Sequence, residues 1–153
     1  MATFILLSAI PGSGKSTWAE AYKNTHPRTY IVSSDDLRLE IAGRVSDLSK
    51  DHLVWPEFLA RILARRHEEG ATVIADATMV SNDFRDYYFK QAEGFAKRIL
   101  VVWNIPFLLA KQRNESREED KVVPAAVMER MQELFEPVAD YVREEYDEVI
   151  EIS

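Results

Sequence analysis

The clearest candidate for chemistry in this sequence is a glycine-rich run near its start. Residues 9–17 read Ala-Ile-Pro-Gly-Ser-Gly-Lys-Ser-Thr, between an apolar segment typical of a strand and an amphipathic segment typical of a helix. Small residues let successive backbone N–H groups converge on phosphate oxygens, and the helix N-terminus adds its positive end. Lys15 could neutralise the β and γ phosphates, and the Ser16 hydroxyl could hold Mg²⁺. The run therefore predicts a nucleoside triphosphate site. Its predicted contact residues are Gly12, Ser13, Gly14, Lys15, Ser16 and Thr17.

The run departs at one position from the usual G-x-x-x-x-G-K-[ST] pattern, because Ala9 stands where the first glycine is expected. Gly12 and Gly14 remain where phosphates approach the backbone most closely. An ordinary glycine-rich turn is the alternative interpretation. The combination of strand, Gly-Lys-Ser-Thr and helix favours the phosphate loop.

A second candidate group follows the predicted strand Thr29–Ser33 and reads Ser-Asp-Asp-Leu-Arg. In a parallel sheet the carboxyl ends of the strands share one edge, so this turn should face the γ phosphate. A carboxylate there could accept a proton from an attacking alcohol, and Arg38 would share a helix face with Asp35. The alternative is that Asp35 or Asp36 caps the next helix. Two adjacent carboxylates allow one cap and one base.

Asp76 follows the third predicted strand, Ala71–Ala75, at the same expected edge of the sheet. An acidic residue at such a strand end could hold a water molecule on Mg²⁺. The alternative is a loop carboxylate that makes an Asx-turn.

Two arginines form a third candidate group. Arg113 and Arg117 are four residues apart, so both side chains point the same way if that stretch is helical. They lead into residues 115–123, which are charged and lack a clear apolar face, and we expect a mobile surface segment there. A lid over the triphosphate, at about residues 113–124, would use their planar guanidinium groups to bridge phosphate oxygens. The alternative is a solvated face in which these arginines pair with nearby glutamates.

The elements that must position these residues alternate between short aliphatic runs and longer amphipathic ones. Strands separated by helices of ten residues or more imply parallel βαβ units, so we predict a doubly wound α/β sheet. The predicted strands are Phe4–Ile10, Thr29–Ser33, Ala71–Ala75, Arg98–Trp103 and Val149–Ile152. The predicted helices are Lys15–Lys23, Asp36–Ala42, Asp51–Glu69, one from Ser81 to about Glu93, one from Pro106 to about Asn114, and two that begin at Pro124 and Pro137.

Length and composition narrow the class of protein. A chain of 153 residues suits one domain, 1–153, and no apolar run approaches the length of a membrane span. The absence of cysteine excludes disulfides, cysteine zinc sites and thiol nucleophiles. Residues 131–153 carry the whole net charge of −7, so the first 130 residues are neutral and phosphate binding remains open. The N-terminus lacks a signal-peptide pattern, and we expect a cytoplasmic protein.

Together the motifs resemble the 5′-kinase domain of phage T4-type polynucleotide kinases. The resemblance rests on Pro-Gly-Ser-Gly-Lys-Ser-Thr-Trp-Ala, Asp-Asp-Leu-Arg, Val-Ile-Ala-Asp-Ala-Thr, and Arg-Asn-x-x-Arg before Val-Pro, in this order, and covers about residues 3–138. It implies a P-loop kinase-like three-layer sandwich with a mostly parallel central sheet and a helical lid. It also implies ATP and Mg²⁺ as cofactors and nucleic acid 5′-OH ends as the acceptor.

The resemblance implies a role for each matching residue. Asp35 would be the general base on the 5′-hydroxyl, and Arg38 would contact a phosphate of the acceptor strand. Arg117 would stabilise the transferring phosphoryl group, with Arg113 as a second nucleotide contact, while Lys15 and the phosphate loop hold ATP.

Two further features depart from the family pattern. Met79 stands where the family usually has asparagine, so a polar contact is lost there. The Asp-x-Asp-Gly-Thr motif of the phosphatase half is absent, so removal of a 3′-phosphate is not expected.

The sequence thus favours an ATP- and Mg²⁺-dependent kinase that phosphorylates the 5′-hydroxyl of DNA or RNA. No Asn-Lys-x-Asp guanine motif occurs, and the length leaves no room for the subdomains of a large motor ATPase. A P-loop kinase for a small molecule, such as a sugar, nucleoside or antibiotic, shares the same core and stays open. A non-catalytic nucleotide-binding module is the third interpretation; the acceptor-side residues argue against it.

Overall fold

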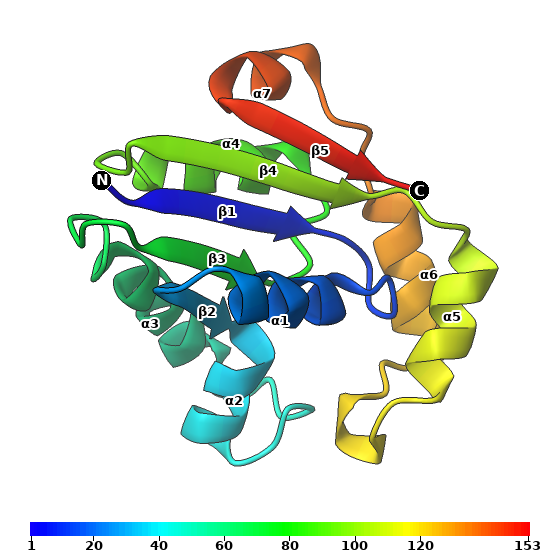
Figure 1. Cartoon of the computed structure of the whole chain (residues 1–153). Helices are drawn as coiled ribbons and strands as arrows, with labels where there is room; N and C mark the ends of the chain where they lie inside the picture. The colour runs from blue at the N-terminus through cyan, green and yellow to red at the C-terminus, as the bar shows by residue number, and fades with distance from the viewer.

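The computed structural model describes residues 1–153 as a five-stranded, entirely parallel sheet with the strand order β2-β3-β1-β4-β5 (Figure 1). The predicted α/β class is confirmed, and each predicted strand lies within two residues of an observed one. The strands are β1 (Thr3–Ser8), β2 (Thr29–Ser33), β3 (Thr72–Asp76), β4 (Lys97–Trp103) and β5 (Glu148–Ile152).

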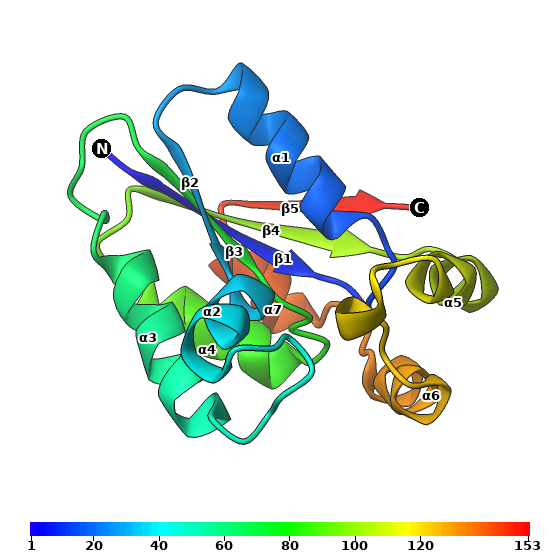
Figure 2. The ribbon, with the colours of Figure 1, turned by 90° about the horizontal axis from the view of Figure 1, so that it is seen from below.

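Helices cover both faces of the sheet, which confirms the predicted three-layer sandwich. Viewed from below, α1 lies on one face, whereas α3, α4 and α7 lie on the other (Figure 2). The helices are α1 (Lys15–Thr25), α2 (Ser34–Ala42), α3 (Asp51–Leu63), α4 (Asn82–Gln91), α5 (Phe107–Glu115), α6 (Ala125–Leu134) and α7 (Asp140–Glu145). A short 3₁₀ turn, Glu119–Lys121, lies between α5 and α6. No helix is long and apolar enough to cross a membrane.

The alternation of side chains along β1 explains the two apolar layers. Phe4 and Leu6 belong to the larger core, with side chains from α3, α4 and α7, whereas Ile5 and Leu7 pack with α1. Each such side chain, fully buried, contributes roughly 1.5–3 kcal/mol. A strand buried on both faces reads as a continuous apolar run, which is why β1 and β4 were recognisable in the sequence.

The prediction of one long helix over Asp51–Glu69 is wrong at its C-terminal end. The α-helix stops at Leu63, and turns lead from there to Gly70. Arg66 donates to the Leu63 carbonyl from both its backbone N–H and Nη1. These bonds satisfy a carbonyl at the helix end and turn the chain away from the helix axis.

A buried arginine that the sequence did not reveal links three parts of the fold. Arg85 on α4 is completely buried. Its Nε donates to Ser8 Oγ at 3.1 Å, and its Nη1 donates to Asn82 Oδ1 at 2.9 Å and to the Glu136 carbonyl at 2.8 Å. These bonds compensate for the lost hydration of the guanidinium and tie β1 and α4 to the segment before α7.

A pair of carboxyl groups joins α4 to α7. The side chain of Glu145 lies against that of Asp86, and one oxygen of Glu145 is buried with no hydrogen-bond partner. Burial and the neighbouring Asp86 raise the pKa of Glu145 to about 7, while Lys90 and Arg98 oppose the shift. A protonated Glu145 can donate to Asp86, whereas two carboxylates at this position repel each other.

We expect the substitution Glu145→Gln to remove a pH dependence of stability. In the unfolded chain Glu145 has its ordinary pKa of 4.5. Between pH 4.5 and about 7 the folded state therefore binds more protons than the unfolded state, and its stability falls as the pH rises through that window. The glutamine amide keeps a donor for Asp86 without titrating. The midpoint of thermal unfolding should therefore match that of the wild type near pH 4.5 and exceed it near pH 8.

The matched control is Glu144→Gln, because Glu144 is the neighbouring glutamate and its side chain is exposed. Its difference from the wild type should not vary between the two pH values. A Glu145→Gln effect of equal size at both pH values would show that the carboxyl pair does not titrate in the folded state.

Candidate active site

The candidate site lies where the carboxyl ends of β2, β3 and β1 meet at one edge of the sheet (Figure 1). The glycine-rich run joins β1 to α1, α2 follows β2 directly, and Asp76 is the last residue of β3. α5 and the segment after it lie beyond this edge. The parallel topology therefore brings the three groups predicted from the sequence together.

The glycine-rich run has the geometry of a phosphate loop. Gly12 and Gly14 have φ values of +81° and +98°, which residues with a Cβ rarely adopt. A Cβ at Gly12 would lie 2.1 Å from the carbonyl oxygen of Ala110, so α5 packs directly against the loop. The hydroxyl of Ser13 is buried without a hydrogen-bond partner. A phosphate oxygen would satisfy that hydroxyl, and the loop therefore fits a phosphate ligand.

Asp76 lies beside the two polar residues that open α1. Ser16 Oγ donates to Asp76 Oδ2 at 2.7 Å, and Lys15 Nζ lies 3.6 Å from Asp76 Oδ1. No backbone N–H donates to the Asp76 carboxylate, so the Asx-turn alternative does not apply. A hydroxyl and a carboxylate oxygen are the hard ligands that Mg²⁺ prefers, and its remaining ligands would be phosphate oxygens and water.

The two predicted departures leave this geometry intact. Ala9 is fully buried and donates its N–H to the Thr78 carbonyl at 2.8 Å. Met79 is buried in the larger core with φ +44°, a left-handed conformation that asparagine adopts more readily. Its carbonyl accepts a hydrogen bond from Ser8 Oγ. The backbone there makes a polar contact whatever the side chain.

Neither aspartate after β2 caps α2. Ser33 Oγ accepts the N–H of Asp36 at 3.2 Å and is the N-cap, so the alternative that an aspartate caps this helix is wrong. Asp35 instead contacts two arginines: its Oδ1 lies 3.3 Å from Arg38 Nη1, and its Oδ2 lies 3.4 Å from Arg117 Nη2.

Asp36 faces a different environment from its neighbour. Burial raises its pKa, the negative charges of Asp76 and Asp35 add to that shift, and Lys121 opposes it. The two adjacent aspartates are thus chemically distinct, since Asp35 has two cationic partners within 3.4 Å and Asp36 has none in an ion pair.

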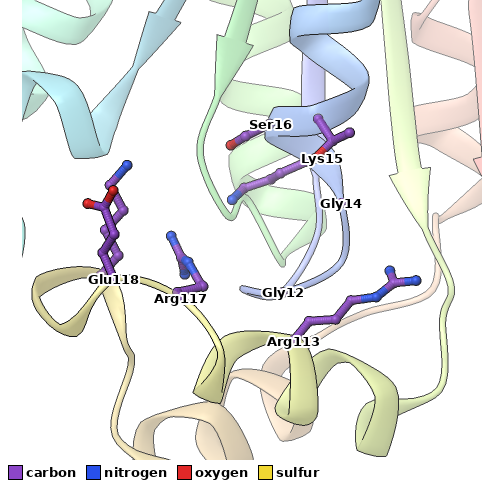
Figure 3. Close-up of a pocket in the computed structure, with 9 residues that line it drawn as sticks. Gly12, Gly14, Lys15, Ser16, Arg113, Arg117 and Glu118 are labelled. Atoms are coloured by element: carbon purple, nitrogen blue, oxygen red, sulfur yellow. The ribbon is translucent and has the colours of Figure 1, made fainter.

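Arg113 and Arg117 line the cavity from opposite sides of Gly12 (Figure 3). α5 ends at Glu115, so Arg113 lies on the helix and Arg117 lies beyond it. The sequence predicts that both side chains point the same way only if residues 113–117 are helical, and the helix ends before Arg117. Arg117 extends toward α2, where Asp35 lies, whereas Arg113 extends the other way.

The cavity at this edge has a volume of about 350 Å³ and no hydrophobic lining residue. Its four cationic residues outnumber its single acidic residue, which suits a polyanionic ligand. Two of the lining residues, Glu118 and Lys121, were not singled out in the sequence because their charged segment carries no motif. The lining consists of Gly12, Gly14, Lys15, Ser16, Thr17, Arg113, Arg117, Glu118 and Lys121.

The segment expected to be mobile is tied to the protein at two places. Asp120 accepts hydrogen bonds from the N–H of Val45 at 2.7 Å and from the hydroxyl of Ser46 at 2.6 Å, in the loop between α2 and α3. These bonds lower the pKa of Asp120 to about 2. The Asn114 side chain exchanges two hydrogen bonds with the backbone of Val123. The segment therefore bridges α5 and the loop between α2 and α3.

The fold and the phosphate loop together define a P-loop kinase fold, which supports phosphotransferase activity in general. The family described as "AAA domain" matches residues 5–138, and the chain belongs to that family. P-loop kinase domains use ATP with Mg²⁺ generally. No curated protein sequence matches this chain at a significant level.

Several solved structures share this fold, and some of them are kinases. The Pnkp1/Rnl/Hen1 RNA repair complex contains a chain with a TM-score of 0.76 and 23% identity; the match covers 95% of this chain and 46% of that one. A gluconokinase from Sinorhizobium meliloti 1021 has a TM-score of 0.64 and 21% identity, with coverages of 97% and 81%. A fungal RNA kinase has a TM-score of 0.70 and 16% identity, with coverages of 100% and 75%. This chain thus spans about half of the first, and such identities establish the fold alone.

We expect Gly12→Ala to destabilise the protein more than Gly43→Ala. Both glycines have positive φ, +81° and +87°, so both substitutions carry a conformational cost of roughly 1–2 kcal/mol. Only at Gly12 does the new methyl group meet backbone, the Ala110 carbonyl, which adds about 1–3 kcal/mol of overpacking. Urea unfolding measures both costs, and calorimetry should show weakened ATP binding for Gly12→Ala alone. Equal costs at the two positions would mean that α5 does not pack on the loop in solution.

Proposed function

We propose that this P-loop kinase is a polynucleotide 5′-hydroxyl kinase that uses ATP and Mg²⁺, with residues 1–153 forming one kinase domain and residues 113–124 its lid. The observation that carries the proposal is the position of Asp35. Its carboxylate lies between an arginine of its own helix and an arginine of the lid, 3.3 and 3.4 Å away, at the sheet edge that holds the phosphate loop. A carboxylate at this position, next to the phosphate site, can accept the proton of an attacking alcohol.

In the proposed reaction the acceptor hydroxyl gives its proton to Asp35 as its oxygen attacks the γ phosphorus. The bond from that phosphorus to the bridging oxygen of ADP breaks, so the products are the phosphorylated acceptor and ADP. Lys15 and Arg117 are the side chains available to offset the charge on the transferring group. Mg²⁺ held at Ser16, with Asp76 beside it, would neutralise charge on the β and γ phosphates.

Arg117 contacts both the proposed base and the phosphate cavity. In the structure its Nη2 pairs with Asp35 Oδ2 at 3.4 Å, and it also lines the phosphate cavity. A γ phosphate competes with that carboxylate for the same guanidinium. Transfer of Arg117 from Asp35 to the phosphate would leave one oxygen of the base free for the acceptor proton.

A nucleic-acid acceptor is supported by the arginine on the other side of the base. Arg38 is mostly buried, pairs with Asp35 and does not line the phosphate cavity. A cation there suits a phosphate of the acceptor strand. The resemblance to T4-type polynucleotide kinases and the fold shared with a chain of an RNA repair complex and with a fungal RNA kinase support the same acceptor.

A small-molecule kinase is the second candidate, favoured by the contact between Asp120 and the loop at Val45 and Ser46. This contact links the segment after α5 to the loop after α2, so an acceptor between them would have limited room, and a small alcohol needs less room than a strand end. The fold shared with a gluconokinase fits this candidate equally well.

We expect the wild type to transfer labelled γ phosphate from Mg-ATP to a short 5′-hydroxyl oligonucleotide, and Asp35→Asn to lower kcat by about 10²–10⁴ because it removes the base. Asp36→Asn is the matched control at the adjacent position and should retain most of the activity. Calorimetry should show that both variants bind ATP as the wild type does. If ATP binds but the oligonucleotide stays unlabelled, the acceptor is not a nucleic acid, and small alcohols are tested next.

We expect the KM for the oligonucleotide to rise steeply with salt, because several phosphates release counterions on binding. Loss of one phosphate contact in Arg38→Gln should reduce the slope of log KM against log salt by about 0.7. A control with Arg61→Gln removes an exposed arginine that pairs with Glu40 and Glu57, and should leave the slope unchanged. A flat salt dependence in the wild type would favour the small-molecule candidate.

A further inference from the structure

The side chain of Arg38 donates two hydrogen bonds to an aspartate of the next helix, α3. Asp51 Oδ1 accepts from Arg38 Nε at 2.9 Å, and Asp51 Oδ2 accepts from Nη2 at 3.2 Å. The two parallel hydrogen bonds form a fork between α2 and α3. The Arg38 side chain is only 11% exposed, so this fork lies in a largely desolvated environment where it fixes geometry strongly.

The fork determines which donors of Arg38 face the site. A guanidinium has five N–H donors in one plane. Three are used, two by Asp51 and one by Asp35, which leaves one donor on each terminal nitrogen without a protein partner. Because Asp51 takes the Nε edge, the Nη1 end of the plane is directed toward Asp35. Without Asp51 the guanidinium could rotate about its single contact with Asp35.

Asp51 also has an ordinary explanation, since it lies in the first turn of α3 and an acidic residue there is favoured by the helix dipole. That explanation requires no partner on α2. The helix dipole therefore does not explain why Asp51 makes two hydrogen bonds to a mostly buried arginine beside Asp35.

We infer that Asp51 is a positioning residue that holds Arg38 for the acceptor, an inference that rests on the proposed function. Asp51 does not touch the acceptor. It fixes the plane of the guanidinium, so that the remaining donors of Arg38 can bind an acceptor phosphate while Nη1 keeps its contact with Asp35.

The protein contains a second arginine–carboxylate fork between the same two helices. Arg61 on α3 donates from Nη1 and Nη2 to the two oxygens of Glu40 on α2, each at 3.0 Å. Both residues are about half exposed, and neither lines the cavity. Glu40→Gln therefore breaks a matched link between α2 and α3 away from the site. It serves as the control for a merely structural role.

The direction in which Asp51→Asn changes the acceptor KM distinguishes a positioning role from an effect of local charge. Asp51→Asn removes a negative charge near a site for a polyanion, so electrostatics alone would tighten acceptor binding and lower its KM. Loss of positioning acts in the opposite direction, because asparagine offers one acceptor oxygen and a donor that repels Nη2.

The experiment measures steady-state transfer of labelled phosphate to a 5′-hydroxyl oligonucleotide by the wild type, Asp51→Asn, Asp51→Glu and Glu40→Gln. We expect Asp51→Asn to raise the acceptor KM about tenfold, with the KM for ATP and kcat within about twofold of the wild type. Asp51→Glu keeps the charge and the link to α2 but displaces the guanidinium, so it should also raise the acceptor KM. Glu40→Gln should leave all three parameters unchanged. Thermal unfolding of each preparation checks that the variants are folded. If Asp51→Asn does not fold, Asp51→Glu still tests the inference.

Three results would overturn the inference. An unchanged acceptor KM in both Asp51 variants would mean that the fork is structural, and a lower KM in Asp51→Asn would mean that Asp51 acts only through its charge. An equal rise in the KM for ATP would mean that the whole site is disturbed. These results all require transfer by the wild type, whereas absence of that transfer would overturn the proposed function and the inference with it.

Discussion

Parallel pairing of β2, β3 and β1 is the constraint on which the rest of the site depends. Its register sets Ser33 opposite Asp76 and Leu6 opposite Ala75, so all three strands end at one edge of the sheet. Residues 60 positions apart in the sequence, Ser16 and Asp76, thereby come within hydrogen-bond distance. A strand is buried on both faces only when helices cover them, so the same packing that stabilises the sheet also fixes where the polar residues emerge.

The convergence of these strands brings several aspartates close together, and the cationic side chains of the site pair with them. Three aspartates lie at one edge: burial raises the pKa of Asp36, and the negative charges of Asp76 and Asp35 add to that shift. Lys15 pairs with Asp76, and both Arg38 and Arg117 pair with Asp35. The cations are thus ordered before any ligand arrives, and a triphosphate competes with carboxylates for them. In the proposed reaction this competition would release the base as the phosphate binds.

α5 and the segment after it are positioned by contacts on two sides of the site. On one side the carbonyl of Ala110 lies so close to Gly12 that only a glycine fits there. On the other side Asp120 binds the backbone of the loop that follows α2. Together with the ion pair between Arg117 and Asp35, these contacts connect the phosphate loop with α2 and the loop that follows it. A substrate that enters must fit between them or displace them.

The sequence by itself determined the elements and the phosphate loop, because these depend on local order: the strand-loop-helix run around Lys15, the apolar strands, and aspartates directly after strand ends. It also indicated Asp35, Arg38, Arg113 and Arg117. It placed the end of α3 wrongly, since the bonds from Arg66 that end the helix are no part of a sequence period. Asp51, Asp120 and the buried Arg85 went unnoticed, because each is one charged residue among many until folding brings its partner from another element. Which of these charges meet is a property of the tertiary structure alone, because ion pairs depend on distance in space and not along the chain.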